Sequence, residues 1–155
     1  MLNIASFRIP TDSMHPALQP GDNILVNKSI MGARIFDIWE AAEEKEVEIR
    51  RLPGLGKVKR NDVLVFHYPY PHKNDSLSMH LLKYYVKRCI ALPGDTMGIK
   101  QGHYYVKGID GLIGNVDAQE RIARLNIVGV ATRIWKSVNA STGEMRWNRV
   151  MKEIE

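Results

Sequence analysis

Cysteine, long apolar runs and repeats are scarce or absent in this sequence. Its 155 residues include one cysteine, Cys89, so no disulfide can form within the chain and cysteine usage leaves the cellular compartment open. No stretch approaches the roughly 18 to 20 consecutive apolar residues that a helix needs to cross a bilayer. The pattern of a secretory signal peptide is also missing. The lack of internal repeats excludes repeat arrays.

The composition fits one globular domain. Apolar residues make up 45% of the sequence and charged residues 25%, as in soluble proteins with a packed core. The formal net charge is +5, which is compatible with an anionic phospholipid surface or nucleic acid but selects neither. We therefore expect residues 1–155 to form a single domain whose function depends on particular residues rather than on bulk charge.

Short apolar segments separated by proline, glycine and asparagine predict a mainly β protein. We expect strands at 2–9, 23–28, 63–67, 83–92, 127–135 and 144–150, and a hairpin of 96–99 with 103–106. Residues 50–60 should form a loop or ribbon, and 69–78 a loop. Helical spacing of apolar residues predicts an amphipathic helix over 35–46, a short helix is an option at 118–125, and 13–18 should form one helical turn. Many short strands are typical of a barrel-like or sandwich fold.

Two residues, Ser13 and Lys87, could act together chemically. Ser13 follows an apolar extended segment, and Lys87 lies in a predicted strand on the same face as Tyr85 and Cys89. Burial lowers the pKa of a lysine, and a neutral lysine can take the proton that a serine must lose to become a nucleophile. Both residues also have simpler interpretations, Ser13 as a helix N-cap and Lys87 as an edge-strand lysine with its head in water. The strand pattern alone favours the simpler interpretation of Lys87.

Five segments of the chain, in the same order, resemble conserved boxes of the type I signal peptidases, which are membrane-anchored Ser/Lys endopeptidases. They are IPTDSMHPAL at 9–18, GDNILVNK at 21–28, KRNDVLVF at 59–66, YVKRCIALPGD at 85–95, and NIVGVATRIW at 126–135 together with RWNR at 146–149. The resemblance covers most of the chain, and YVKRCIALPGD is its most specific part. It implies the β-barrel-like fold shared by signal peptidases and LexA-like proteins, with many short strands and one or two short helices.

The same resemblance implies roles for individual residues. Ser13 would be the nucleophile and Lys87 the general base, while the Ser13 N–H and the Thr11 hydroxyl would form the oxyanion hole. Shallow apolar substrate pockets would be lined by Phe7, Ile9, Met14, Leu18, Ile24, Val65, Tyr85 and Val86. Plain core packing is an equally good account of these apolar residues. An extended substrate would add as a strand beside 7–10 and 84–86.

The implied partners are signal peptides of secretory preproteins, cut after small residues in an Ala-X-Ala pattern, and a phospholipid membrane surface, with no nucleic acid. No cofactor or metal is implied. The implied location is the bacterial cytoplasmic membrane, with the catalytic domain on its outer side. We expect this chain itself to be a soluble form, and the sequence leaves open whether an anchor precedes it.

One box of the family has no counterpart in this chain. Signal peptidases carry a string rich in Gly-Asp-Asn and ending in Asp-Ser-Arg, whose serine orients the lysine and whose acidic residues pair with the arginine after it, here Arg88. We therefore expect a cap domain reduced or deleted around 109–125, either in a minimal relative or through an internal deletion. A catalytically inactive scaffold that binds extended peptides or a membrane partner remains the alternative. A LexA-like repressor ranks last, since no helix-turn-helix is visible.

Two further groups of residues are weaker signals. His67, His72 and His80 have no spacing typical of a metal site, so surface-loop positions are the simpler interpretation. A basic cluster could contact anionic lipid headgroups, although a solvated basic loop is the simpler interpretation. Its members are Arg50, Arg51, Lys57, Lys59 and Arg60.

Overall fold

The protein is mainly β, as the sequence predicts. The computed structural model describes residues 3–35, 50–71, 77–107, 113–115 and 127–154. Within these ranges it contains ten strands and one short 3₁₀ helix, η2 (Trp147–Arg149). None of the described helices is long and apolar enough to cross a membrane.

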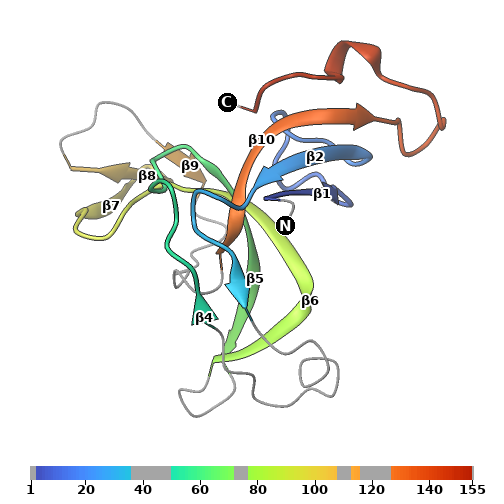
Figure 1. The fold of residues 1–155 in the computed structure, drawn as a ribbon. Helices are drawn as coiled ribbons and strands as arrows, with labels where there is room; N and C mark the ends of the chain where they lie inside the picture. Colours follow the sequence, from blue (N-terminus) through green and yellow to red (C-terminus); the bar gives the residue numbers. More distant parts are fainter. Residues whose placement is uncertain (1–2, 36–49, 72–76, 108–112, 116–126, 155) are drawn as a thin grey trace.

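The main sheet has five antiparallel strands in the order β1-β2-β10-β5-β6 (Figure 1). These strands are β1 (Ile4–Arg8), β2 (Asp22–Asn27), β5 (Val63–Pro71), β6 (Leu77–Arg88) and β10 (Ile127–Ser137). The central strand is thus the last in the chain, and it joins the β1–β2 hairpin to the β5–β6 hairpin. The first five residues of β10 are buried, which fits the unbroken run Ile-Val-Gly-Val-Ala.

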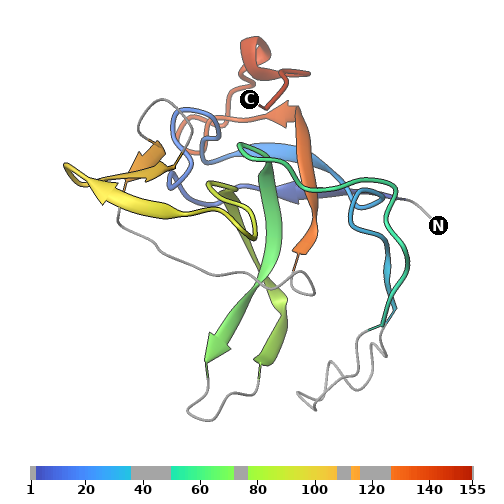
Figure 2. The ribbon, with the colours of Figure 1, turned by 90° about the vertical axis from the view of Figure 1, so that its left-hand side faces the viewer.

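Two smaller sheets flank the main one. One pairs β3 (Arg34–Ile35) with β4 (Arg50–Arg51). The other contains β7 (Met97–Lys100), β8 (His103–Val106) and β9 (Ile113–Asn115), and it projects away from the main sheet (Figure 2). The predicted hairpin of 96–99 with 103–106 is confirmed by β7 and β8. The strand β4 begins the predicted loop or ribbon at 50–60, whereas β3 and β9 were not predicted.

The main sheet buries apolar side chains on both faces. The first cluster contains Ile9, Leu18, Ile24, Val26, Val63, Val65, Val128, Ala131 and Ile134. The second cluster contains Met31, Leu64, Phe66, Ile127 and Val130. Neighbouring β5 residues alternate between the two clusters, because successive side chains of a strand point to opposite faces.

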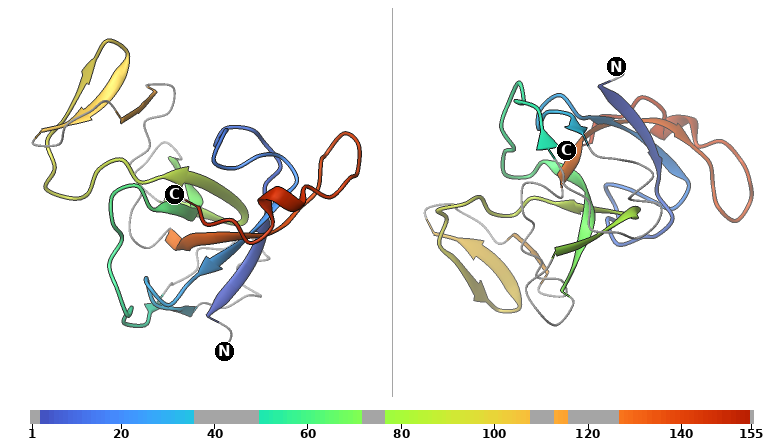
Figure 3. Two further views of the ribbon diagram at one scale, coloured as in Figure 1. Left: turned by 90° about the horizontal axis from the view of Figure 1, so that it is seen from above. Right: turned by 60° about the horizontal axis from the view of Figure 1, so that its bottom comes forward.

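The sheet curls so that its two edge strands approach each other over the first cluster. Phe7 of β1 and Tyr84 of β6 lie with their ring centroids 4.8 Å apart, although no backbone pairing joins these strands in the described sheet order. The view from above shows the curved arrangement (Figure 3). This geometry supports the barrel-like prediction, with a gap in the hydrogen bonding between β1 and β6.

Residues 144–150 do not form the predicted strand. The chain turns after Asn139, forms η2 and then runs back along β10, where Glu153 bridges Arg133. Met145 makes only an isolated bridge to Val138. Arg146 and Arg149 both reach the carboxylate of Asp22. Residues three apart point to opposite faces of a strand but to one side of a helical turn, so this shared contact requires the turn.

The predicted loop over 69–78 is also partly wrong, because β5 continues to Pro71 and β6 begins at Leu77. Pro69 and Pro71 lie in β5 beyond Phe66, the last β5 residue whose pairing with β10 is described. Proline lacks an N–H and cannot donate to a strand ladder. The predicted helices at 35–46 and 118–125 lie almost wholly outside the described residues.

Candidate active site

Ser13 lies in the loop of residues 10–20 that joins β1 to β2, which we name the Ser13 loop. Two backbone hydrogen bonds close its neck: the Ile9 N–H donates to the Asp22 carbonyl (2.8 Å) and the Gly21 N–H donates to the Ile9 carbonyl (2.9 Å). The antiparallel pairing of β1 with β2 leads directly into this neck. The loop is therefore held at both ends by the sheet.

The Ser13 loop contains hydrogen-bonded turns but no helix, so the predicted helical turn at 13–18 is wrong. The Leu18 N–H donates to the Met14 carbonyl (2.9 Å), and the His15 N–H donates to the Asp12 carbonyl (2.8 Å). Leu18 is fully buried, whereas Ser13 is exposed. The turn thus inserts one apolar side chain into the first cluster and leaves the serine accessible.

Lys87 lies near the end of β6, half-buried and opposite Leu64 of β5. Tyr85 is opposite Phe66, and their rings have centroids 6.2 Å apart. Cys89 packs on the same second cluster. The predicted alternation is confirmed, since Tyr85, Lys87 and Cys89 share one face.

The structure does not bring Ser13 and Lys87 into direct contact. Lys87 lies on the face of the second cluster, and Met14, next to Ser13, packs against the first. No hydrogen bond between Ser13 and Lys87 occurs among the described residues. Catalytic hydrogen bonds often tighten only when substrate binds, so the pairing of these residues stays a prediction.

Seven of the eight predicted pocket residues belong to the first cluster or pack against it. Ile9, Leu18, Ile24 and Val65 are buried, and a ligand could contact them only at the floor of a depression. The partly buried members are Phe7, Met14 and Val86. The eighth residue, Tyr85, lies on the opposite face of β6.

Polar contacts hold the end of β6 beside Lys87. The Cys89 N–H donates to the Asp62 carbonyl and the Asn61 N–H donates to the Cys89 carbonyl, both at 2.8 Å. Arg60 forms a two-pronged ion pair with Asp95, which also accepts the Leu92 N–H. The hydrogen bonds from Arg60 and then from Leu92 lower the pKa of Asp95. These contacts tie the chain before β5 to the chain after β6.

The chain segments around the end of β6 also supply the partner of Arg88 and the surroundings that shift the pKa of Cys89. Arg88 donates to the Asn61 carbonyl (2.9 Å), so it has a partner even though the acidic box of the family is missing. Burial, followed by the negative charge of Asp62, raises the pKa of the Cys89 thiol. At neutral pH this cysteine is therefore a half-buried neutral thiol.

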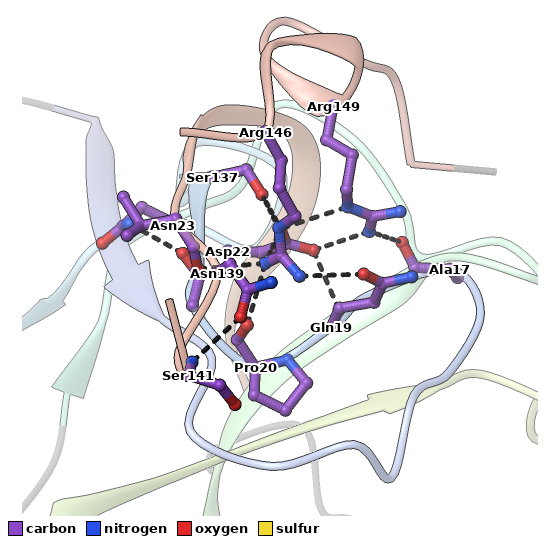
Figure 4. A network of polar contacts seen from close by, with 12 residues as sticks. Ala17, Gln19, Pro20, Asp22, Asn23, Ser137, Asn139, Ser141, Arg146 and Arg149 are labelled. Carbon is purple, nitrogen blue, oxygen red and sulfur yellow. Dashed lines mark hydrogen bonds and ion pairs between the residues drawn. The ribbon is translucent and has the colours of Figure 1, made fainter. Parts of the chain in front are cut away.

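A buried polar network surrounds Asp22, the first residue of β2 (Figure 4). Its carboxylate accepts hydrogen bonds from the Ser137 hydroxyl (2.6 Å), the Arg149 guanidinium (2.6 and 3.2 Å), the Arg146 guanidinium (3.2 Å) and the Gln19 N–H (2.8 Å). Burial acts to raise the pKa of Asp22, but the donors, led by Arg149, outweigh it and leave the pKa below its ordinary value. Sequence reasoning missed this network, although an aspartate opening a buried strand indicates a buried partner.

Of the three histidines considered for a metal site, His67 has contacts within the protein. His67 is buried, lies 2.7 Å from an Arg34 nitrogen, and its ring centroid is 4.5 Å from that of Tyr84. His72 lies outside the described residues and His80 lies in β6. Among the described residues no group of three or more histidine, cysteine or acidic side chains could hold a metal ion.

Arg51 and Arg60 of the basic cluster are bound within the protein. Arg51 donates to the carbonyls of Met31, Gly32 and Ile127 at 3.2, 3.0 and 2.6 Å, and Arg60 pairs with Asp95. The favoured interpretation of a solvated loop is therefore wrong for Arg51, because its guanidinium binds the carbonyls of two other backbone segments. Lys57 and Lys59 are exposed.

Comparison with known proteins assigns the chain to a family. A family model described as "Signal peptidase, peptidase S26" matches residues 1–135. The chain belongs to this signal peptidase family. The matched residues include both Ser13 and Lys87, whereas Arg146 and Arg149 lie beyond them.

Individual signal peptidases are similar to parts of the chain. Signal peptidase I of Pseudomonas aeruginosa is 36% identical over 107 residues, which are 68% of this chain and 31% of that protein. Signal peptidase I of Pseudomonas fluorescens is 38% identical over 95 residues, 61% of this chain and 26% of that protein. Signal peptidase I of a Buchnera aphidicola strain is 36% identical over 89 residues. The matched residues thus span less than a third of the length of these curated relatives.

Proposed function

We propose that this protein is a signal peptidase I-like serine endopeptidase that cleaves signal peptides from preproteins after small residues. The observation that carries the proposal is the family match over residues 1–135, which includes the segments of Ser13 and Lys87. The exposure of Ser13, and the partial burial of Phe7, Met14 and Val86 against the first cluster, support it. We further propose that residues 1–155 form one catalytic core with its cap reduced or deleted around 109–125.

In the proposed reaction, the Ser13 Oγ attacks the scissile carbonyl carbon while Lys87, as the general base, accepts the hydroxyl proton. The Ser13 N–H and the Thr11 hydroxyl donate to the oxyanion, and one such donor is worth about 10²–10³ in rate. Lys87 then gives its proton to the leaving amine, and water hydrolyses the ester. The reaction requires Lys87 to reach Ser13 in the substrate complex.

The binding mode that fits this fold is strand addition between β1 and β6. These edges are bridged by the Phe7–Tyr84 ring contact but not by backbone hydrogen bonds in the described sheet. An extended peptide could pair with the backbone of these two edge strands and place alternate side chains over Phe7, Met14 and Val86. Small side chains suit this surface, because the residues beneath it are already packed.

The direct test is cleavage of a short Ala-X-Ala peptide by the 155-residue chain in detergent or lipid. We expect measurable turnover, loss of turnover in Ser13→Ala, and loss in both Lys87→Ala and Lys87→Arg, since an arginine cannot act as a base at neutral pH. Ser141→Ala and Lys136→Ala, which change exposed residues of the same types, should retain activity. Mass spectrometry of the products gives the cleavage site.

Equal and null turnover by the unchanged chain and by Ser13→Ala would instead support the inactive scaffold. In that case the same peptide should still bind, and its affinity should fall when Phe7 or Val86 is changed to aspartate. Absence of both cleavage and binding would contradict the proposed function and the scaffold alternative together.

A further inference from the structure

The Asp22 network joins the C-terminal segment to the Ser13 loop. Asp22 is fully buried and accepts from two arginines that follow it by more than a hundred residues. Two guanidinium groups facing one carboxylate leave surplus positive charge, which must be met by other acceptors. Those acceptors are largely in the loop itself.

Arg149 bridges the carboxylate and the loop. Its Nη2 donates both to the Asp22 Oδ2 (2.6 Å) and to the Ala17 carbonyl (2.9 Å), and its Nε donates to the Asp22 Oδ1 (3.2 Å). Arg149 is itself buried. The planar guanidinium offers donors in a fixed fork, so the direction of the Ala17 carbonyl is set by the position of Asp22.

Arg146 contacts the loop at two more points. Its Nη1 donates to the Gln19 side-chain oxygen (2.9 Å), and its Nη2 donates to the Pro20 carbonyl (2.8 Å). Its Nε donates to the Ser137 hydroxyl (2.8 Å), which in turn donates to Asp22. Figure 4 shows these side chains converging on the loop from the C-terminal segment. Together the two arginines hold 17–20, the half of the loop that follows the serine.

The rest of the Ser13 loop has few long-range polar contacts of its own. Its internal hydrogen bonds span at most four residues, and Ser13, Thr11 and Asp12 are exposed. The position of the serine therefore depends on the neck at Ile9, on the burial of Leu18, and on the arginine contacts at 17–20.

We propose that Arg149, assisted by Arg146, is a positioning residue that holds the Ser13 loop in the geometry needed for attack on the peptide. The inference rests on the proposed endopeptidase function and extends it to a segment outside the residues matched by the family model. Neither arginine contacts the reacting atoms. Their effect passes through Asp22 and the carbonyls of Ala17 and Pro20.

The key variant is Arg149→Lys, which keeps the charge but replaces the fork by a single nitrogen that cannot span both carboxylate oxygens and the Ala17 carbonyl. The matched control is Arg133→Gln. Arg133 forms an exposed ion pair with Glu153 and so also holds the C-terminal segment, but its described ion pair does not involve the Ser13 loop. Val130→Ala in the second cluster controls for a general loss of stability.

Hydrogen exchange tests the inference without any need for activity. In Arg149→Lys we expect at least about tenfold faster exchange of the Leu18 and His15 amides, which close the turns of the Ser13 loop, and unchanged exchange in β5 and β6. Unchanged exchange at Leu18 and His15, or equal acceleration throughout the sheet, would overturn the positioning role. If Arg149→Lys does not fold, Arg146→Lys is measured by the same criterion, because Arg146 is less buried.

Peptide cleavage supplies the second readout. We expect kcat to fall by about 10- to 100-fold in Arg149→Lys with KM nearly unchanged, because a small misplacement of a reacting group costs rate rather than ground-state binding. Arg133→Gln and Val130→Ala should retain kcat. An unchanged kcat in Arg149→Lys would overturn the inference. If the unchanged chain cleaves nothing, the proposed function fails, and hydrogen exchange alone decides whether the arginines position the loop.

Discussion

Asp22 shows how strongly one residue can depend on its partners. A carboxylate taken out of water is unfavourable unless donors replace its hydration, and here five donors from four residues do so. Removing one partner of such a buried ion pair costs about 3–5 kcal/mol of stability, because a charge is left buried without compensation. This cost is far larger than the net contribution of the pair. The network is therefore both a structural requirement and a link between distant segments.

The stability of the fold should fall in acid through Asp22. Its pKa is lowered in the folded state, so its contribution is complete above the pKa of an unfolded aspartate, about 3.9, and is lost as the pH falls from there through the folded pKa. Urea unfolding from pH 7 to pH 2 should show this loss. We expect Asp22→Asn to be less stable than the unchanged protein at neutral pH. Its free energy of unfolding should fall less steeply with decreasing pH, and the two slopes should differ by up to about 1.4 kcal/mol per pH unit.

Asp12→Asn, a change at an exposed aspartate, provides the comparison for that experiment. It should follow the unchanged protein across the whole pH range. Asp95 also has a lowered pKa, but it contributes equally to all three proteins. Parallel acid curves for Asp22→Asn and the unchanged protein would contradict the account of the network.

The β1–loop–β2 unit illustrates what a single element needs from its backbone. Gly21 directly follows the Ser13 loop and has φ +91°. A Cβ placed on it would lie 1.9 Å from the Val138 carbonyl oxygen. The Val138 N–H donates to the Gly21 carbonyl at 3.1 Å. Only glycine permits both the left-handed conformation and this close approach to the chain that follows β10.

Gly21→Ala should destabilise the protein more than Gly143→Ala, a change that forces a left-handed alanine but creates no steric clash. Gly143 also has a positive φ, +74°, but nothing lies within 4 Å of its added Cβ. We expect Gly143→Ala to cost about 1 kcal/mol, the usual cost of a left-handed alanine. Gly21→Ala should cost clearly more, because the Val138 backbone must also move. Denaturant unfolding measures both, and equal losses would show that the close approach is not maintained in solution.

At the scale of the whole molecule, β5 and β10 make the two apolar clusters one cooperative unit. Each strand contributes residues to both clusters: Val65 and Phe66 are neighbours in β5 on opposite faces, and Val130 and Ala131 are neighbours in β10. A strand cannot leave one cluster without leaving the other. The clusters should therefore unfold together.

Core truncations on the two faces should shift the same transition. Ile24→Ala in the first cluster should lower the unfolding free energy by about 2–5 kcal/mol, and Phe66→Ala in the second by about 3–5 kcal/mol. Far-ultraviolet circular dichroism and tryptophan fluorescence should report one coincident transition in each variant. Two separate transitions in Phe66→Ala would show that the faces unfold independently.

The sequence by itself determined the mainly β fold, the hairpin of β7 and β8, and the family resemblance that the match over 1–135 confirms. These depend on local patterns: alternation of apolar residues, turn-forming glycine and proline, and short motifs. The tertiary structure decided the central place of β10, the placement of Tyr85 away from the other predicted pocket residues, and the turn at 144–150. In each case the deciding contact joins residues far apart in the chain. Arg149 and Asp22 are 127 positions apart, and no local pattern records which buried carboxylate a C-terminal arginine will meet.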